Sequence, residues 1–382
     1  MLGRALALLA VISCGCGSRL PFAPAGPGAA PDPSDFGPFP VGVETVVIED
    51  PARTSSTGVP RRLVVELWYP AAESARGGPG TDYRFVDALP ADKAALLGER
   101  ALGSLHTEAV RGAPIAEEGE DFPLVLFSHA NGALRMQSTY LTVPLASHGF
   151  VVAAPDHAGN TLTELLASDE VDVGAQLLSF QDRPRDLGVV LDALLRAQVA
   201  PKIAARIDPS AIGTLGHSFG AVTAIRTAGL EPRIRAVVAQ APAGYDVAWL
   251  DLERPLNALG IPVMIEVGGL DHTLPGDAVL DSYRPWLGAP HYLARFSTAG
   301  HFSFSDLCTI DVEAAAAIGV NVGSFLSDGC GPENMPSSVA FPLFRRLSIG
   351  LFNHALRRSP GSAAYLGAGS ELLRLDVDPG AP

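Results

Sequence analysis

The pentapeptide Gly216-His217-Ser218-Phe219-Gly220 combines a potential nucleophile with flanking glycines. An apolar run at 211–215 precedes it, and an apolar run at 219–228 follows. A G-x-S-x-G motif between a strand and a helix is typical of a sharp turn that exposes the serine hydroxyl. Glycine is expected at both ends because a Cβ there would collide with the neighbouring helix and strand. We therefore predict that Ser218 is a nucleophile beside a helix N-terminus, whose N–H groups favour a developing oxyanion.

A serine hydroxyl is a poor nucleophile until a base removes its proton. For this kind of turn the expected chain order is serine, then acid, then histidine. Asp271 follows an apolar run at 261–267 and a glycine pair, and His301 follows a run at 291–297. Loops at the carboxyl ends of parallel strands meet at one edge of the sheet. We predict that His301 is the general base toward Ser218 and then the acid toward the leaving alcohol, with Asp271 orienting its imidazole.

Other histidines and one other carboxylate compete for these roles. His157 also follows a strand, and we consider it the next candidate, with a structural or substrate-facing role. His129 lies on the same edge, His217 is expected to point away from the hydroxyl, and His272 adjoins Asp271. Asp246 is the alternative acid, because it also follows a predicted strand.

An oxyanion needs two N–H donors. The residue after the nucleophile, Phe219, is expected to provide one. The loop Ser128-His129-Ala130-Asn131-Gly132 follows another predicted strand. We assign the second donor to Asn131, with Ala130 as the next choice.

Alternation of apolar runs and helical patterns surrounds these residues. It predicts an α/β fold with a mostly parallel central sheet and helices on both faces. Strands are expected at 123–128, 150–154, 211–215, 234–240, 261–267 and 291–297, and helices at 135–148, 182–198, 219–228 and 340–355. Before them we expect an antiparallel pair at 43–49 and 61–69, a loop at 71–90 and a helix at 91–105.

Two segments, 160–180 and 303–337, interrupt the alternation beside the predicted site. They could form a lid or an acyl-pocket wall, or they could simply pack against the body of the protein. Among the large apolar residues of these segments are Leu162, Leu165, Leu166, Leu177, Leu178, Phe304 and Phe325, and Phe302 lies just before the second segment.

On these motifs the chain resembles the α/β-hydrolase superfamily, in particular the dienelactone-hydrolase-like and platelet-activating-factor-acetylhydrolase-like serine esterases. The similar stretches lie within residues 43–358 and are 127–132, 145–157, 182–186, 216–220 and 299–302. The resemblance implies an α/β-hydrolase fold and an ester hydrolase with an acyl-enzyme intermediate.

This chain departs from that group at several positions. Ala130 and Ala221 stand where the group usually has glycine. The acetylhydrolases place their acid one strand earlier, near 240–242, where this chain has no carboxylate. True dienelactone hydrolases use a cysteine nucleophile, and Ser218 argues against that activity.

The N-terminal residues predict export. Residues 1–16 read as a lipoprotein-type signal peptide in which Cys14 would be lipidated, and residues 17–40 as a tether rich in proline and glycine. Residues 41–382 would then form one catalytic domain. The expected location is the bacterial cell envelope, with simple secretion as the alternative. In an oxidising compartment, Cys308 and Cys330 are expected to form a disulfide, although two buried thiols are the alternative.

Composition excludes several classes of function. With 27 Lys and Arg against 41 Asp and Glu, the net charge of −14 disfavours nucleic-acid binding. We expect no cofactor and no metal, because no phosphate loop or cluster of metal ligands is apparent. We therefore predict a carboxylic ester hydrolase acting on short-chain acyl or lipid esters, with a membrane contact only through the lipid anchor. An acyltransferase, a peptidase or an inactive surface-anchored binding protein are the alternatives. The sequence leaves the oligomeric state open.

Overall fold

The computed structural model describes residues 31–54, 58–167, 173–252, 255–320, 323–367 and 369–380. The predicted signal peptide, Cys14 and most of the predicted tether lie outside these residues.

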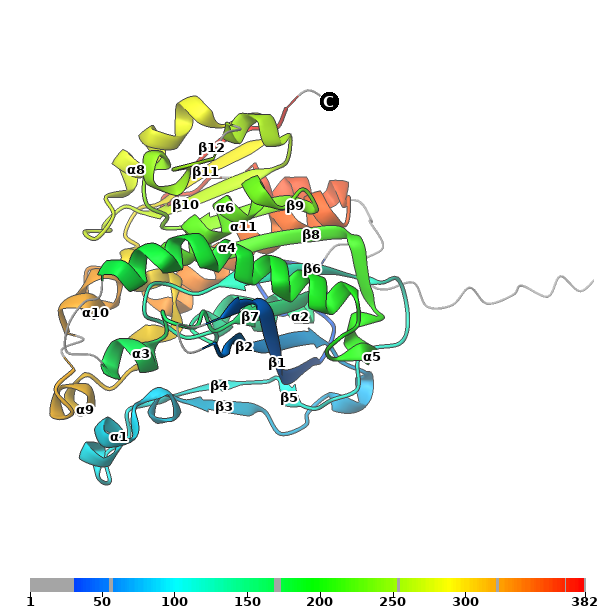
Figure 1. Cartoon of the computed structure of the whole chain (residues 1–382). Coiled ribbons are helices and arrows are strands. Elements are labelled where there is room, and N and C mark those ends of the chain that lie inside the picture. The colour runs from blue at the N-terminus through cyan, green and yellow to red at the C-terminus, as the bar shows by residue number, and fades with distance from the viewer. Residues whose placement is uncertain are drawn as a thin grey trace, which may run out of the picture.

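A twisted sheet of ten strands, in the order β12-β11-β10-β9-β8-β6-β7-β2-β1-β5, forms the centre of the molecule (Figure 1). The strands from β6 to β11 are all parallel, whereas β2 runs antiparallel to β1 and β7, and β12 runs antiparallel to β11. This arrangement confirms the predicted mostly parallel sheet. Its strands are β1 (Val41–Thr54), β2 (Pro60–Pro70), β5 (Val110–Arg111), β6 (Phe122–Ser128), β7 (Val151–Pro155), β8 (Ile207–His217), β9 (Ile234–Gln240), β10 (Val263–Gly268), β11 (His291–Phe296) and β12 (Leu373–Asp378).

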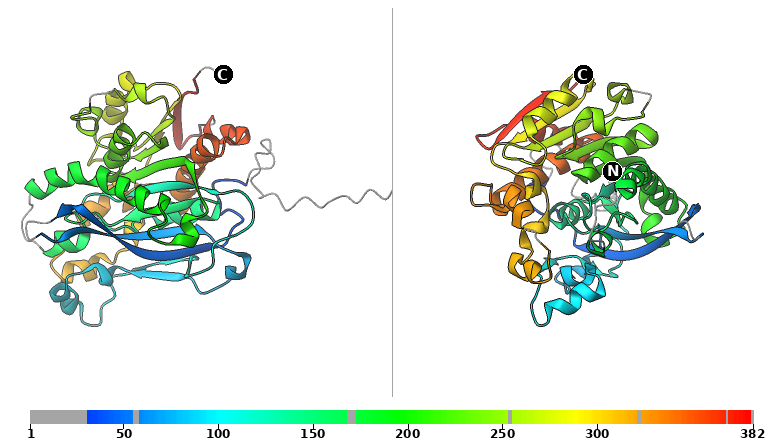
Figure 2. Two further views of the ribbon diagram at one scale, coloured as in Figure 1. Left: turned by 45° about the vertical axis from the view of Figure 1, so that its right-hand side comes forward. Right: turned by 60° about the vertical axis from the view of Figure 1, so that its left-hand side comes forward.

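Helices cover both faces of the sheet (Figure 1, Figure 2). The larger ones are α2 (Thr139–Ser147), α4 (Val173–Leu195), α6 (Phe219–Leu230), α8 (Gly276–Tyr283) and α11 (Ser337–Leu356). The shorter ones are α1 (Ala91–Leu97), α3 (Leu162–Ala167), α5 (Pro201–Ala204), α7 (Tyr245–Ala248), α9 (Val312–Ala317) and α10 (Gly323–Cys330). α4, α6 and α8 pack on one face, and α2 and α11 pack on the other.

Strand β6 shows why the sequence predicts a sheet buried on both sides. Leu124 and Leu126 belong to the core shared with α4 and α6, whereas Val125 and Phe127 belong to the core shared with α2 and α11. Because successive side chains of a strand point to opposite faces, a continuous apolar run is needed where helices cover both.

The structure corrects the prediction for residues 71–105. The predicted loop contains β3 (Thr81–Arg84), which pairs with β4 (Ser104–Thr107) in a separate small sheet. The predicted helix ends at Leu97, since Gly98 follows it with a φ of +60°. Alternate burial of Tyr83 and Leu105 stabilises the ladder, although its strands are too short for a clear periodic signal.

Two further segments differ from the predicted elements. Near the C-terminus, where no strand was predicted, Leu373–Asp378 forms β12, an edge strand that pairs with β11 through all six of its residues. In the predicted tether, Phe39 N–H donates to the Ser147 carbonyl (3.1 Å), and His148 Nε2 donates to the Asp35 carbonyl (3.0 Å). Residues 35–39 are therefore attached to the end of α2.

We predict that Phe344→Ala lowers the free energy of unfolding by about 3–5 kcal/mol, the usual cost of deleting a buried aromatic ring. Phe344 in α11 is fully buried, and its ring lies 4.4 Å from that of Phe304 and 4.6 Å from that of Phe296. Chemical denaturation measures the loss. Val339→Ala is the control on the same helix, because Val339 is 37% exposed and should change stability by less than about 1 kcal/mol.

Candidate active site

Ser218 lies in the turn that joins β8 to α6, in the backbone conformation φ +56°, ψ −121°. Such a positive φ is rare for a residue with a side chain, and it lifts the partly exposed serine above the sheet. The turn is possible because Gly216 and Gly220 lack Cβ atoms. A Cβ on Gly216 would lie 2.1 Å from the Gly220 carbonyl oxygen, and one on Gly220 would lie 1.9 Å from the Ser128 carbonyl oxygen.

The structure brings together the three residues that the sequence assigns to catalysis. His301 Nε2 lies 2.9 Å from Ser218 Oγ, and His301 Nδ1 lies 2.8 Å from Asp271 Oδ2. Asp271 and His301 are 5% and 2% exposed, so water is largely excluded from their pair. The other Asp271 oxygen accepts the Leu274 N–H at 2.6 Å, which fixes the carboxylate in its loop. The serine is thus hydrogen-bonded to an imidazole whose tautomer a carboxylate can hold.

The competing residues have other positions. Asp271, and not Asp246, bonds to His301; Asp246 is an exposed residue of α7. The exposed His272 donates its backbone N–H to Asp328. Buried His217 points away from the hydroxyl, as predicted, and its Nε2 donates to the His301 carbonyl at 2.9 Å.

His157 belongs to a second Ser-His-Asp set, formed with Ser128 and Asp186. Its Nε2 lies 2.9 Å from Ser128 Oγ, and its Nδ1 lies 2.9 Å from Asp186 Oδ2. All three residues are fully buried. Ser128 Oγ also accepts a hydrogen bond from Arg183 at 3.1 Å, so the hydroxyl is held from two sides. This set resembles the first in connectivity, but no substrate can reach its serine.

Charge holds the second set in a fixed protonation state. Burial alone would raise the pKa of Asp186, but hydrogen bonds from Arg61 and His157 outweigh it and hold the pKa below its usual range. Arg61 binds this carboxylate with two hydrogen bonds of 2.8 and 2.7 Å. Burial, reinforced by the charge of Arg183, lowers the pKa of His157 to about 4, so the imidazole is neutral at pH 7. A neutral, buried imidazole beside a bonded serine is suited to holding a loop in place.

Arg183 connects this buried set to the predicted oxyanion loop. Its guanidinium donates to the His129 carbonyl and, at 2.8 Å, to Asn160 Oδ1. Asn160 in turn donates to Asn131 Oδ1 at 2.8 Å. The same guanidinium lies 4.7 Å above the Phe219 ring. The fully buried Arg183 therefore contacts Phe219 directly and is linked to Asn131 through the side-chain amide of Asn160.

Gln137 connects the oxyanion loop to the serine turn from the other side. Its Oε1 accepts the Ala130 N–H at 2.8 Å, and its Nε2 donates to His217 Nδ1 at 3.0 Å. The Ala130 N–H is thereby occupied, which leaves Asn131 as the candidate donor in this loop. Phe219 begins α6, and an N–H in the first turn of a helix has no acceptor within that helix. The role of these two N–H groups stays a prediction.

In the two segments beside the site, some apolar side chains pack in the core and others are exposed. Phe304 is fully buried in the core, and Leu162 and Leu166 pack against that core. Leu165, Leu177 and Leu178 are 46%, 66% and 63% exposed. The side chain of Phe325 lies outside the described residues.

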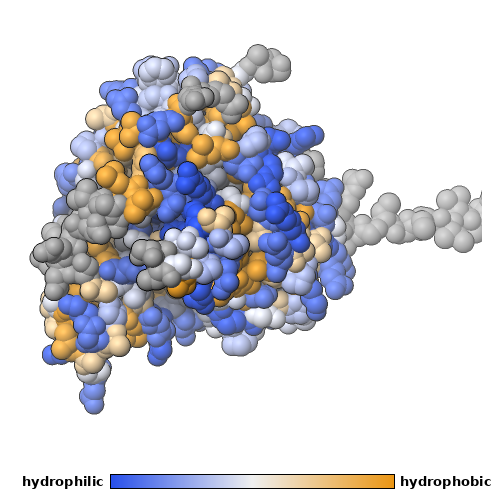
Figure 3. Space-filling view, viewed as in Figure 1, coloured by the Kyte–Doolittle hydropathy of each residue, from blue (hydrophilic) through white to orange (hydrophobic). Residues whose placement is uncertain are grey.

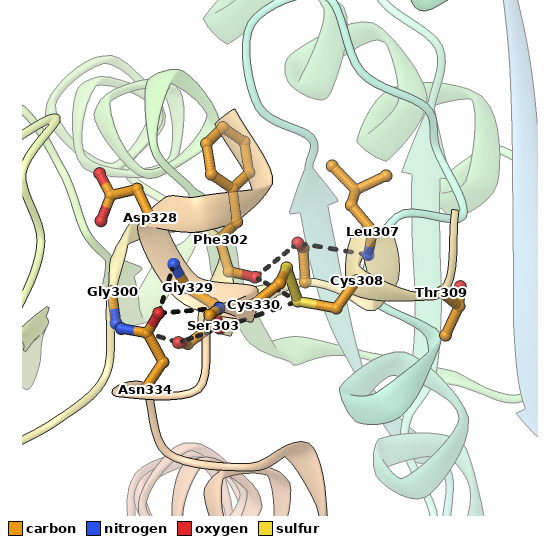
Figure 4. Close-up of a disulfide and its surroundings, with 12 residues drawn as sticks. Gly300, Phe302, Ser303, Leu307, Cys308, Thr309, Asp328, Gly329, Cys330 and Asn334 are labelled. Carbon is orange, nitrogen blue, oxygen red and sulfur yellow. Dashed lines mark hydrogen bonds between the residues drawn. A yellow bond between two sulfur atoms is a disulfide. The ribbon is translucent and has the colours of Figure 1, made fainter. Parts of the chain in front are cut away.

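The predicted disulfide between Cys308 and Cys330 is present, and it closes the segment that follows His301 (Figure 4). Hydrophobic and hydrophilic residues are interspersed on the face viewed in Figure 3. In the described ranges no helix is long and apolar enough to cross a membrane. Within the same ranges no three His, Cys, Asp or Glu side chains are grouped as metal ligands.

Three residues of this region were not singled out from the sequence: Gln137, Arg183 and Asp328. A signal for Arg183 existed, because it lies one helical turn before Leu187 on the apolar face of an amphipathic helix. A cation on that face is either paired or functional. No comparable signal marks Gln137 or Asp328, which lie in irregular backbone or act across long sequence separations.

We predict that the protein loses stability as the pH falls from about 6.5 toward 4. Burial lowers the pKa of four histidines. The pKa falls to about 4 for His148 and His157, and well below the usual value for His129 and His217. Near pH 5 these are neutral when folded and protonated when unfolded. Burial raises the pKa of Glu266 to about 7 and that of Asp306 to about 6, so these two bind protons in the folded state instead. The unfolded chain thus binds about two more protons from these groups, which corresponds to about 3 kcal/mol per pH unit.

Chemical denaturation at pH 7, 6 and 5 measures this slope. His148→Gln should reduce the slope by about one proton, or roughly 1.4 kcal/mol per pH unit. Stability that stays constant over this range would contradict the account of the buried histidines.

Comparison with known proteins gives the same fold. Residues 29–170 match the family described as platelet-activating factor acetylhydrolase, isoform II. The acetylhydrolase of Cavia porcellus is 28% identical over 183 residues, which are 38% of this chain and 41% of that protein. Cutinase est1 of Thermobifida alba is 25% identical over 143 residues, 37% of this chain and 43% of the cutinase. The matches thus span less than half of these curated relatives.

A solved structure matches nearly the whole chain. The ferulic acid esterase from Streptomyces cinnamoneus superimposes with a TM-score of 0.66 at 24% identity, covering 88% of this chain and 96% of the esterase. The chain therefore has the α/β-hydrolase fold, as its motifs predicted, and it is similar in sequence to proteins described as acetylhydrolases and cutinases.

Proposed function

We propose that the protein is a carboxylic ester hydrolase in which Ser218, His301 and Asp271 form the catalytic triad. The observation that carries the proposal is the pair of hydrogen bonds, 2.9 and 2.8 Å, that joins a partly exposed serine to a carboxylate through His301. The similarity to proteins described as acetylhydrolases, cutinases and a ferulic acid esterase supports ester hydrolysis as the reaction.

Acylation begins at the hydrogen bond between Ser218 and His301. As Ser218 Oγ forms a bond to the ester carbonyl carbon, its proton passes to His301 Nε2. Asp271 stabilises the imidazolium through Nδ1. The carbonyl oxygen becomes an oxyanion, which the N–H groups of Phe219 and Asn131 would bind. Collapse of this intermediate breaks the bond to the alcohol oxygen, which takes the proton from His301.

Deacylation repeats these steps with water. His301 removes a proton from the water molecule, whose oxygen attacks the acyl carbon bound to Ser218 Oγ. The second tetrahedral intermediate breaks the bond to Ser218, which recovers its proton from His301. The product is a carboxylic acid, and the enzyme returns to its starting state.

The same similarity supports a proposal for the substrate class. We propose esters with a short acyl group, or lipid esters, as substrates, and p-nitrophenyl acetate is the simplest probe. Product analysis with added alcohol or peptide acceptors would separate hydrolysis from acyl transfer and peptide cleavage.

Two serine variants provide the test of function. Ser218→Ala should lower kcat for p-nitrophenyl acetate by at least about 1,000-fold, because it removes the nucleophile. Ser128→Ala removes only the hydroxyl of the buried set and should retain activity within about tenfold. The two variants make the same chemical change, so each is the control for the other. Full activity in Ser218→Ala, or loss of activity in Ser128→Ala alone, would contradict the assignment.

We further propose that Cys14 carries a lipid that anchors the protein to the cell envelope. Labelled palmitate should be incorporated into the wild type and into Cys16→Ala, but not into Cys14→Ala. Incorporation that survives Cys14→Ala would refute this anchor.

A further inference from the structure

The carboxylate of Asp328 lies where the backbone around the proposed acid meets that around the proposed base. It comes from the end of α10, two residues before Cys330, in the segment that the disulfide closes (Figure 4). Asp328 is 6% exposed and far from Ser218 in the sequence.

Four donors converge on this carboxylate. The His301 N–H reaches Oδ1 at 3.1 Å. The His272 N–H lies 3.1 Å from each oxygen. Thr273 donates its N–H at 2.8 Å and its hydroxyl at 2.7 Å to Oδ2. Burial alone would raise the pKa of Asp328, but these hydrogen bonds outweigh it and lower the pKa, which keeps the group ionised.

The donors identify what this carboxylate does. His301 is the proposed base, and His272 and Thr273 directly follow Asp271, the proposed acid. Oδ1 accepts from the backbone of the base, Oδ2 accepts from Thr273 after the acid, and the His272 N–H lies within reach of both oxygens. Asp328 therefore ties together the two loops whose side chains must remain 2.8 Å apart.

The segment that supplies Asp328 is itself held against the loop of the base. A Cβ on Gly300 would lie 2.6 Å from the Gly329 nitrogen, so these two backbones are in close contact. Ser303 Oγ donates to the Gly329 carbonyl at 3.1 Å, and the disulfide joins the same stretch to Cys308. Asp328 thus has little freedom to move away from His301.

We propose that Asp328 is a positioning residue that fixes His301 and Asp271 relative to each other. The proposal rests on the function proposed above. Asp328 touches neither Ser218 nor the reacting atoms, and it acts through the backbone of its neighbours. Small displacements of a catalytic group can lower the rate about 100-fold, whereas substrate binding need not change.

The test is Asp328→Asn. An amide of the same shape has only one acceptor oxygen, so its NH₂ group must face either the His301 N–H or the Thr273 donors. We expect kcat for p-nitrophenyl acetate to fall about 10- to 100-fold with KM nearly unchanged. The rate at which a fluorophosphonate labels Ser218 should fall by a similar factor.

Asp306→Asn is the matched control. Asp306 is also a buried carboxylate in the segment closed by the disulfide, and it accepts bonds from Thr139 Oγ1 (2.8 Å) and the Tyr140 N–H (3.0 Å). It makes none of the contacts of Asp328 with the two loops. This variant should lower the melting temperature but leave kcat unchanged. Should Asp328→Asn fail to fold, Thr273→Val removes one hydroxyl donor and is expected to lower kcat about 2- to 10-fold.

A readout independent of ester turnover separates the two proposals. The proton between His301 Nδ1 and Asp271 should give a downfield NMR signal that Asp271→Asn abolishes. Asp328→Asn should broaden or shift it, and Asp306→Asn should not. An inactive wild type with this pattern would contradict the proposed function but support the positioning role. An unchanged signal and unchanged kcat in Asp328→Asn would overturn the positioning role.

Discussion

The contact between two pieces of backbone, at Gly220 and at the end of β6, is the constraint on which this site depends. Only a residue without a Cβ allows the start of α6 to lie against the Ser128 carbonyl. That approach places the serine turn beside the end of β6, from which the loop with the candidate donor Asn131 begins. Ser218 has its positive φ in the same turn, and its Oγ lies 2.9 Å from His301 Nε2.

Each of the two Ser-His-Asp sets has its serine beside this contact, Ser218 in one set and Ser128 in the other. Ser218 is partly exposed, whereas Ser128 is fully buried and bonded to Arg183. In the buried set, Asp186 and Arg183 support the loop that carries Asn131. Connectivity alone does not distinguish a catalytic triad from a structural one. Exposure of the serine, its backbone conformation and a nearby helix N-terminus do.

The elements that the sequence predicted correctly are those marked by a pattern within a few consecutive residues. Continuous apolar runs indicate buried parallel strands, and the position of Ser218, Asp271 and His301 after such runs predicts that they meet. The pair β3–β4 escaped prediction because four-residue strands show too little alternation. Asp328 escaped because its partners lie 27 to 56 residues away and are mostly backbone N–H groups. Gln137 escaped because one partner is a backbone N–H and the other, His217, lies 80 residues away.

The central claim is that Ser218, and not the equally connected Ser128, carries the acyl group. Labelling the folded protein with a fluorophosphonate and mapping the modified peptide by mass spectrometry tests it most directly. We predict one adduct per chain, on the peptide that contains Ser218. An adduct on Ser128, or folded protein that hydrolyses esters while Ser218 stays unmodified, would contradict it.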